Sequence, residues 1–153
     1  MGGTPFQFRF YALIPVILAA SALVNADAVW NGQPYSLSLP HFSSVGQTAE
    51  ASLVLPLAHD SACSVTVSVA QPGDEVLATG GHSLATSYKL TGAGLSNADA
   101  GYISSADFLT RIYVLPGNGP ADSLTLWVRG AAPSAAAAEA GSYSANITLT
   151  VSW

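Results

Sequence analysis

The sequence predicts an all-β fold, either a sandwich or a barrel, from three observations. From Asp27 onward, apolar and polar residues alternate with a period of two, and clusters of Gly, Pro, Asn and Asp interrupt the alternation. Strand candidates recur about every ten residues, as they do in sandwiches. Charged residues make up 8% of the 153 residues, so turns and sheets are favoured over salt-bridged helices. The length suits one domain.

Residues 1 to 28 have the pattern of a signal peptide. Arg9 precedes an apolar stretch from Phe10 to Val24, and small residues then allow cleavage after either Ala26 or Ala28. The competing interpretation is an uncleaved membrane anchor, but the apolar stretch is about 15 residues and a span needs about 20. We therefore expect an exported chain without membrane insertion after signal cleavage.

Residues 29 to 52 form a separate N-terminal segment, in which Tyr35, Leu37 and Leu39 alternate with serines. The predicted sandwich covers residues 53 to 153. Its first strand contains leucines at positions 53, 55 and 57 that alternate across Pro56, which indicates an edge strand or a bulge. The next strand contains valines at positions 65, 67 and 69.

Further strands are predicted over 84–90, 111–115 and 123–129, and no segment has a convincing helical period. The connector 130–141 contains four consecutive alanines, which allow either one helical turn or a solvated loop. The clearest strand runs from Tyr143 to Trp153. One of its faces carries Tyr143, Ala145, Ile147, Leu149, Val151 and Trp153.

No constellation of catalytic or metal-binding residues is visible, so the sequence predicts no enzyme, no cofactor and no metal site. His41, His59 and His82 lie in separate turn-like contexts and are expected at the surface or in turns. The neighbours of His59, Asp60 and Ser61, do not by themselves form a triad, because a triad assembles in space. Cys63 is expected in the core.

Two further features concern turns and contacts. The glycines at positions 92, 94, 117 and 119 are expected in turns with positive φ. Trp127 is expected opposite the apolar face of its strand, where an exposed ring suits a protein contact. A net charge of -5 with only four scattered cations argues against binding to nucleic acid.

Several stretches resemble one family of proteins. Ser64 to Pro72, Tyr88 to Leu90, Ser105 to Leu109 and Leu124 to Val128 look like parts of alpha-type fimbrial subunits of the colonization-factor-antigen class. The C-terminal block, with Ala140 to Ser144 and the final strand, is also similar to spore coat protein U domains of secreted pili. The resemblance covers residues 53 to 153.

The resemblance implies an incomplete immunoglobulin-like sandwich that lacks one strand. A periplasmic chaperone and then the N-terminal strand of another subunit would fill the groove, and an outer-membrane usher would assemble the fimbrium at the cell surface. An added strand would satisfy both the open edge and the groove. The expected interface residues are Val29, Tyr35, Leu37 and Leu39 in a donor within 29–42, and Tyr143, Ile147, Leu149, Val151 and Trp153 at the groove.

Two alternatives stay open at this point. Polar Asn31 and Gln33 interrupt the donor pattern, which favours a minor or specialised subunit over a major one. A stand-alone secreted β-sandwich that binds a carbohydrate or protein ligand is the other candidate. It differs physically, because a self-sufficient module folds as a soluble monomer, whereas an incomplete subunit needs a strand from another chain.

Overall fold

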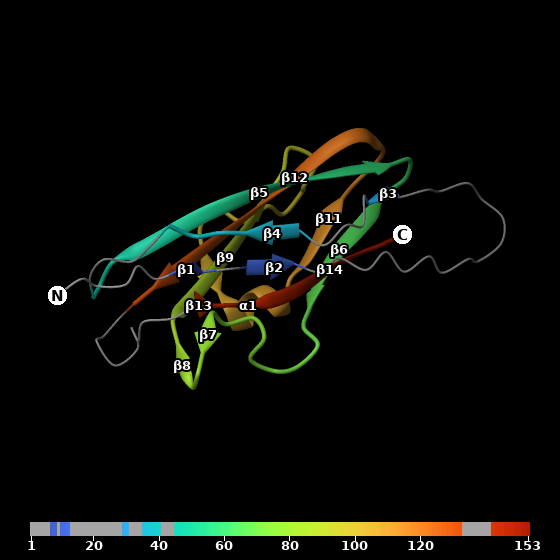
Figure 1. Ribbon diagram of the computed structural model, residues 1–153. Helices are drawn as coiled ribbons and strands as arrows, with labels where there is room; N and C mark the ends of the chain where they lie inside the picture. Colours follow the sequence, from blue (N-terminus) through green and yellow to red (C-terminus); the bar gives the residue numbers. More distant parts are fainter. Residues whose placement is uncertain (1–6, 9, 13–28, 31–34, 41–44, 133–141) are drawn as a thin grey trace.

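The computed structural model describes residues 7–8, 10–12, 29–30, 35–40, 45–132 and 142–153 (Figure 1). The described chain is mostly β-strand with almost no helix, and its two large sheets share one apolar core. The predicted all-β sandwich is therefore confirmed. The four alanines of the connector and His41 lie outside the described residues.

The first sheet has the strand order β10-β9-β12-β5-β3. Its bounds are Ile103–Ser104 for β10, Ala85–Thr91 for β9, Gly119–Ala131 for β12, Thr48–His59 for β5 and Val29–Trp30 for β3. All neighbouring strands run antiparallel. The long pair β5 and β12 crosses the top of Figure 1.

The second sheet has the order β11-β6-β14-β2-β4. Its bounds are Ile112–Leu115 for β11, Cys63–Ser68 for β6, Asn146–Ser152 for β14, Phe10–Ala12 for β2 and Tyr35–Leu37 for β4. The β2 strand runs parallel to β14, and the other pairs are antiparallel. The strand order is immunoglobulin-like. In the first sheet, β3, β5, β12 and β9 correspond to strands A, B, E and D. In the second sheet, β6 and β14 correspond to strands C and F, and β2 occupies the place of strand G.

Small elements complete the described chain. The strands β1 (Gln7–Phe8) and β13 (Ser142–Tyr143) pair in parallel, and β7 (Ala78–Thr79) and β8 (His82–Ser83) form a hairpin. The only helix within the described ranges is α1 (Ser105–Leu109), which the alternation pattern did not predict. Its N-cap is Ser104, whose hydroxyl accepts a hydrogen bond from the Asp107 amide. The cap, rather than an apolar period, is the sequence signal for this helix.

The core forms because alternate residues of both sheets point inward. From the first sheet, Leu55, Leu124 and Leu126 are fully buried, and from the second, Val65 and Leu149 are fully buried. Burial of each such side chain stabilises the fold by about 1.5–3 kcal/mol relative to its exposure. The predicted inward faces of these strands are therefore confirmed.

Two local expectations were only partly right. Pro56 pairs in regular register with Ser123, and the register shift lies between Gly119 and Asp122 of β12, so the predicted bulge is not at Pro56. Gly117 has the predicted positive φ of 79°, but Gly92, Gly94 and Gly119 do not have a positive φ. A Cβ at Gly92 would overlap Leu124 and the Ser123 carbonyl oxygen, and a Cβ at Gly94 or Gly119 would overlap the Asp122 side chain, so close packing, not turn geometry, favours glycine there.

Candidate functional site at the edge of β14

The β14 strand has a neighbour on each side, and the two neighbours differ in origin. On one side, five residues of β14, from Thr148 to Ser152, pair with β6. On the other side, Asn146 pairs with Tyr11 and Ile147 pairs with Ala12 of β2. The β2 strand belongs to the stretch predicted as a signal peptide. The candidate site is this second edge of β14, together with the core residues beneath it.

The alternation in β14 explains why the strand forms and which face it buries. Ile147 and Leu149 are buried in the core, whereas Thr148 and Thr150 on the other face are half-buried. The pattern continues upstream, where Tyr143 and Ala145 are buried. The predicted strand is thus confirmed in its apolar face, although β13 and β14 are two separate strands. The break follows the bridge between Ala78 and Ser144.

The segment proposed as a donor lies next to β2 rather than next to β14. In β4, Tyr35 pairs with Ala12 and Leu37 pairs with Phe10. Leu37 is 7% exposed and Leu39 is 5% exposed, and both belong to the common core. In the described chain, β2 therefore separates β4 from β14 and is the strand partner of both (Figure 1).

The structure brings most of the predicted interface residues together. Seven of them lie in or against the common core: Tyr35, Leu37, Leu39, Tyr143, Ile147, Leu149 and Val151. Trp153 is 50% exposed and does not belong to this core. Val29 lies in the other sheet, where it pairs with Ala58 of β5. Trp153 is therefore apart from the cluster that the other seven form.

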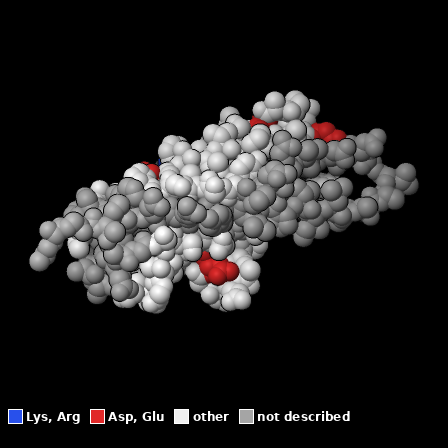
Figure 2. Space-filling view, viewed as in Figure 1, with Lys and Arg blue, Asp and Glu red and all other residues white. Residues whose placement is uncertain are grey.

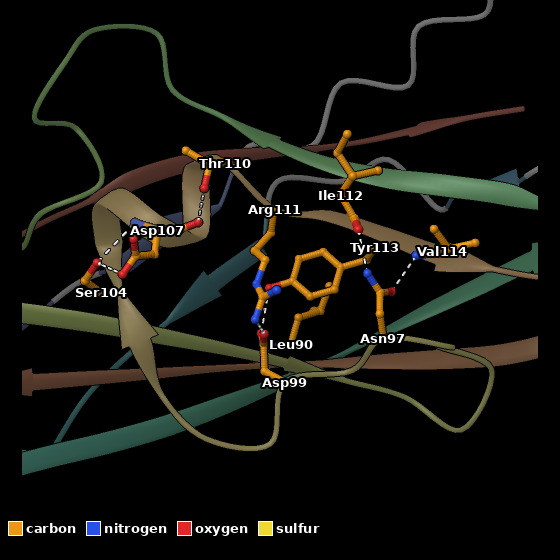
Figure 3. Close-up of polar contacts among 10 residues, drawn as sticks. All are labelled: Leu90, Asn97, Asp99, Ser104, Asp107, Thr110, Arg111, Ile112, Tyr113 and Val114. Carbon is orange, nitrogen blue, oxygen red and sulfur yellow. Dashed lines mark hydrogen bonds and ion pairs between the residues drawn. The ribbon is translucent and has the colours of Figure 1, made fainter.

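The opposite edge of the second sheet is β11, and a loop covers it (Figure 3). The Asn97 amide group contacts the main chain of Ile112 and Val114, and Ser96 also contacts Val114. Residues from the middle of the chain therefore cover the β11 edge, whereas a strand from the predicted signal peptide pairs with β14 and separates it from β4, the other terminal strand of this sheet.

A buried polar network holds that loop in place. Asp99 is 5% exposed, and its Oδ2 accepts hydrogen bonds from the Leu90 amide at 2.9 Å and from the Tyr113 hydroxyl at 2.6 Å. Its Oδ1 faces Nη2 of Arg111 at 3.3 Å, as Figure 3 shows. Burial, and then the hydrogen bond to Asp99, raises the pKa of Tyr113 far above its usual value. The sequence did not predict this network, because its members are not neighbours in any motif.

A second polar pair corrects the expectation for His59, which is buried at 3% exposure rather than at the surface. Its Nε2 lies 3.0 Å from Oδ2 of Asp122, and its Nδ1 lies 2.9 Å from the carbonyl oxygen of Ser61. Burial opposes the charged imidazole, but these two contacts, with the charge of Asp122 and a main-chain hydrogen bond at Gly117, raise the pKa of His59 above 6.5. Gly119 has no room for a side chain beside this pair.

The residues around His59 do not activate Cys63 as a nucleophile. Cys63 is 4% exposed, and burial followed by the charge of Asp122 raises the pKa of its thiol. Asp60 is exposed, and Ser61 contacts His59 through its main chain. His82 lies in the short strand β8. Cys63 is a core residue, as predicted.

The outer face of the first sheet carries a cluster of aromatic and charged side chains. The Lys89 ammonium lies 4.5 Å from the centre of the Trp127 ring, and the Arg129 guanidinium lies 3.8 Å from that of Tyr102. Glu50 bonds to both Arg129 and Tyr102, and these hydrogen bonds, Arg129 first, lower the pKa of Glu50. Trp127 is half-buried rather than exposed, and its ring contacts Lys89 within this cluster.

Few charges appear on the face seen in Figure 2, where acidic side chains form small, separate patches among the described residues. Across the described ranges, no group of three His, Cys, Asp or Glu side chains is arranged to hold a metal ion. The described part of the chain also contains no helix with the length and apolar character needed to cross a membrane.

Comparison with known proteins adds no assignment. No known protein family matches the chain, and no curated protein matches it either.

Proposed function

We propose that the chain is a structural subunit of a bacterial surface fimbria and that a strand from another polypeptide completes its sandwich. The observation that carries the proposal is the origin of β2. This strand fills the place of strand G beside β14, yet it lies within residues 1 to 28, which have the pattern of a cleaved signal peptide. Cleavage after Ala26 or Ala28 would remove the strand that completes the second sheet.

Loss of β2 has two consequences for the rest of the second sheet. The β14 strand would lose its main-chain partner at Asn146 and Ile147, and the apolar side chains beneath that edge, among them Ile147 and Leu149, would lose cover. An open edge above an apolar groove favours association with another strand. A strand added there would form main-chain hydrogen bonds and fill the groove with alternate side chains.

The loss of β2 would also free β4 to act as the donor strand for another subunit. The described residues give β4 one strand partner, β2, so its ladder hydrogen bonds would disappear together with the signal peptide. Its alternate residues Leu37 and Leu39 already have the size and polarity of core residues. In the assembled fibre, the segment containing Tyr35, Leu37 and Leu39 would insert beside β14 of a neighbouring copy or of another fimbrial subunit.

This assembly requires export and assistance. Before a neighbour supplies its strand, a periplasmic chaperone would cover the β14 edge, and an outer-membrane usher would catalyse the exchange at the cell surface. The function supported is thus structural and adhesive, without catalysis or a cofactor.

The test uses residues 29–153 produced without residues 1–28. Alone, this chain should associate or unfold, and a synthetic peptide of residues 29–42 should convert it to a soluble one-to-one complex, measured by light scattering after size-exclusion chromatography. Two variant peptides provide matched controls: Leu37→Asp should abolish rescue, and Ser36→Asp should retain it, because Ser36 is exposed and Leu37 is buried.

The opposite outcome would favour the stand-alone binding module. If residues 29–153 form a soluble monomer that unfolds cooperatively without any peptide, the sandwich is complete by itself. In that case the fimbrial proposal is wrong.

A further inference from the structure

The β11 strand is an edge strand of a kind that favours association between chains. It lies at one end of the second sheet, its residues Ile112–Leu115 carry no charge, and Ile112 and Val114 are 58% and 39% exposed. An exposed, apolar edge strand with high β-propensity pairs readily with another such strand. A second copy would supply a matching strand, because antiparallel pairing of β11 with itself has two-fold symmetry.

Three main-chain groups on the outer side of β11 already have partners in the same chain. The Asn97 side chain donates from Nδ2 to the carbonyl oxygen of Ile112 at 2.7 Å. Its Oδ1 accepts from the Val114 amide at 2.9 Å. The Ser96 amide donates to the carbonyl oxygen of Val114 at 2.9 Å. Figure 3 shows how the amide group of Asn97 lies along the strand between Ile112 and Val114.

We propose that Asn97 closes the β11 edge by imitating a paired strand, and that this closure prevents pairing with β11 of a second copy. A primary amide presents an N–H donor and a carbonyl acceptor side by side, as a strand does, so a single side chain occupies groups that a partner would use. Once β2 is removed with the signal peptide, as the proposed function requires, strand addition to the second sheet is thereby restricted to β14. The inference deepens the proposed function, because a subunit with one accepting edge assembles end to end and not side by side.

The closure persists because its loop is anchored on both sheets. Asp99, two residues after Asn97, bonds to Leu90 of β9 through its carboxylate and its main chain. The same carboxylate accepts from Tyr113 of β11 and faces Arg111. Moving Asn97 away from β11 would strain or break these buried contacts. A buried carboxylate that loses its partners is costly, so the closed position is strongly preferred.

The experiment uses the full chain of 153 residues, in which β2 occupies the β14 edge. Asn97→Ala removes both side-chain hydrogen bonds to β11, and Asn118→Ala is the control at another exposed asparagine. In dilute solution, hydrogen exchange at the Val114 amide should accelerate about tenfold or more in Asn97→Ala. At high concentration, this variant alone should form dimers and larger species, which renew the protection of Val114.

A double variant separates edge pairing from loss of the fold. Adding Val114→Lys to Asn97→Ala places a charge on the exposed strand and should restore the monomer, because edge lysines block strand pairing. The inference is overturned if Asn97→Ala stays monomeric at high concentration with Val114 protected, or if its association persists in the double variant. Either result leaves the peptide test of residues 29–153 untouched, so the two proposals fail independently.

Discussion

Tyr113 offers the sharpest test of the buried network that anchors the loop on β11. The change Tyr113→Phe removes one hydroxyl from a fully buried ring and leaves its volume nearly unchanged. The lost contact is a hydrogen bond of 2.6 Å to Oδ2 of Asp99, an acceptor that still receives the Leu90 amide at 2.9 Å. A hydrogen bond to a charged group contributes about 1.5–3 kcal/mol. We therefore expect the free energy of unfolding to fall by about 2 kcal/mol.

The chain contains a matched control for this substitution. Tyr88 is also fully buried, and its hydroxyl donates at 2.6 Å to the main-chain carbonyl of Glu75, a neutral acceptor. Tyr88→Phe should cost about 0.5–1.5 kcal/mol, the usual contribution of a neutral hydrogen bond. Because the two substitutions remove the same atom from the same kind of environment, their difference isolates the effect of the Asp99 carboxylate.

The assay is denaturant unfolding of the full chain at pH 7, followed by circular dichroism, with thermal unfolding as a second measure. A loss of about 2 kcal/mol corresponds to a fall in Tm of roughly 4–8 °C in a chain of this size. A charged anchor at Asp99 is refuted if Tyr113→Phe lowers the free energy of unfolding by no more than Tyr88→Phe. Such a result would mean that Asp99 does not act as a charged anchor for the loop.

Three further predictions concern the core and the His59 pair. Leu149→Ala should lower the free energy of unfolding by about 2–5 kcal/mol in a denaturant titration, because Leu149 is fully buried beneath the β14 edge. Gly119→Ala should destabilise the chain in the same assay, since its Cβ would overlap Asp122 and His59, whereas Gly101→Ala, with open space, should be neutral. Because the folded pKa of His59 is raised above 6.5, its contribution to stability should be present at pH 5.5 and decline as the pH rises through that folded pKa. His59→Gln should remove this decline, and an equal decline in the variant would assign it to other groups.

Local pattern alone was sufficient to place several strands, β14 and β12 among them, and to identify their buried faces. In β14 and β12, strict alternation placed Ile147, Leu149, Leu124 and Leu126 in the core, and the structure buries all four. The reason is geometric: successive side chains of a strand point to opposite faces, so one face of each strand can be identified without knowledge of its neighbours. Short α1 was missed because its signal is a single cap at Ser104 and not a period.

Polar contacts between distant residues were beyond the reach of the same pattern. His59 and Asp122 are 63 positions apart, and Asp99 meets Tyr113 across 14 positions. Each residue by itself looks like an ordinary turn or surface residue, and only the pairing of β5 with β12, or the return of the loop onto β11, places the partners together. The role of Gly119 follows from the same packing and not from its φ angle.

The sequence by itself determined an all-β fold with alternating strands, because the period of two and the turn residues are local properties that each segment carries alone. Only the tertiary structure decided what pairs with the sides of β11 and β14. It placed Asn97 along β11 and a strand of the predicted signal peptide beside β14. The physical reason is that an edge is defined by what pairs with it, and strand pairing joins residues that are far apart in the chain.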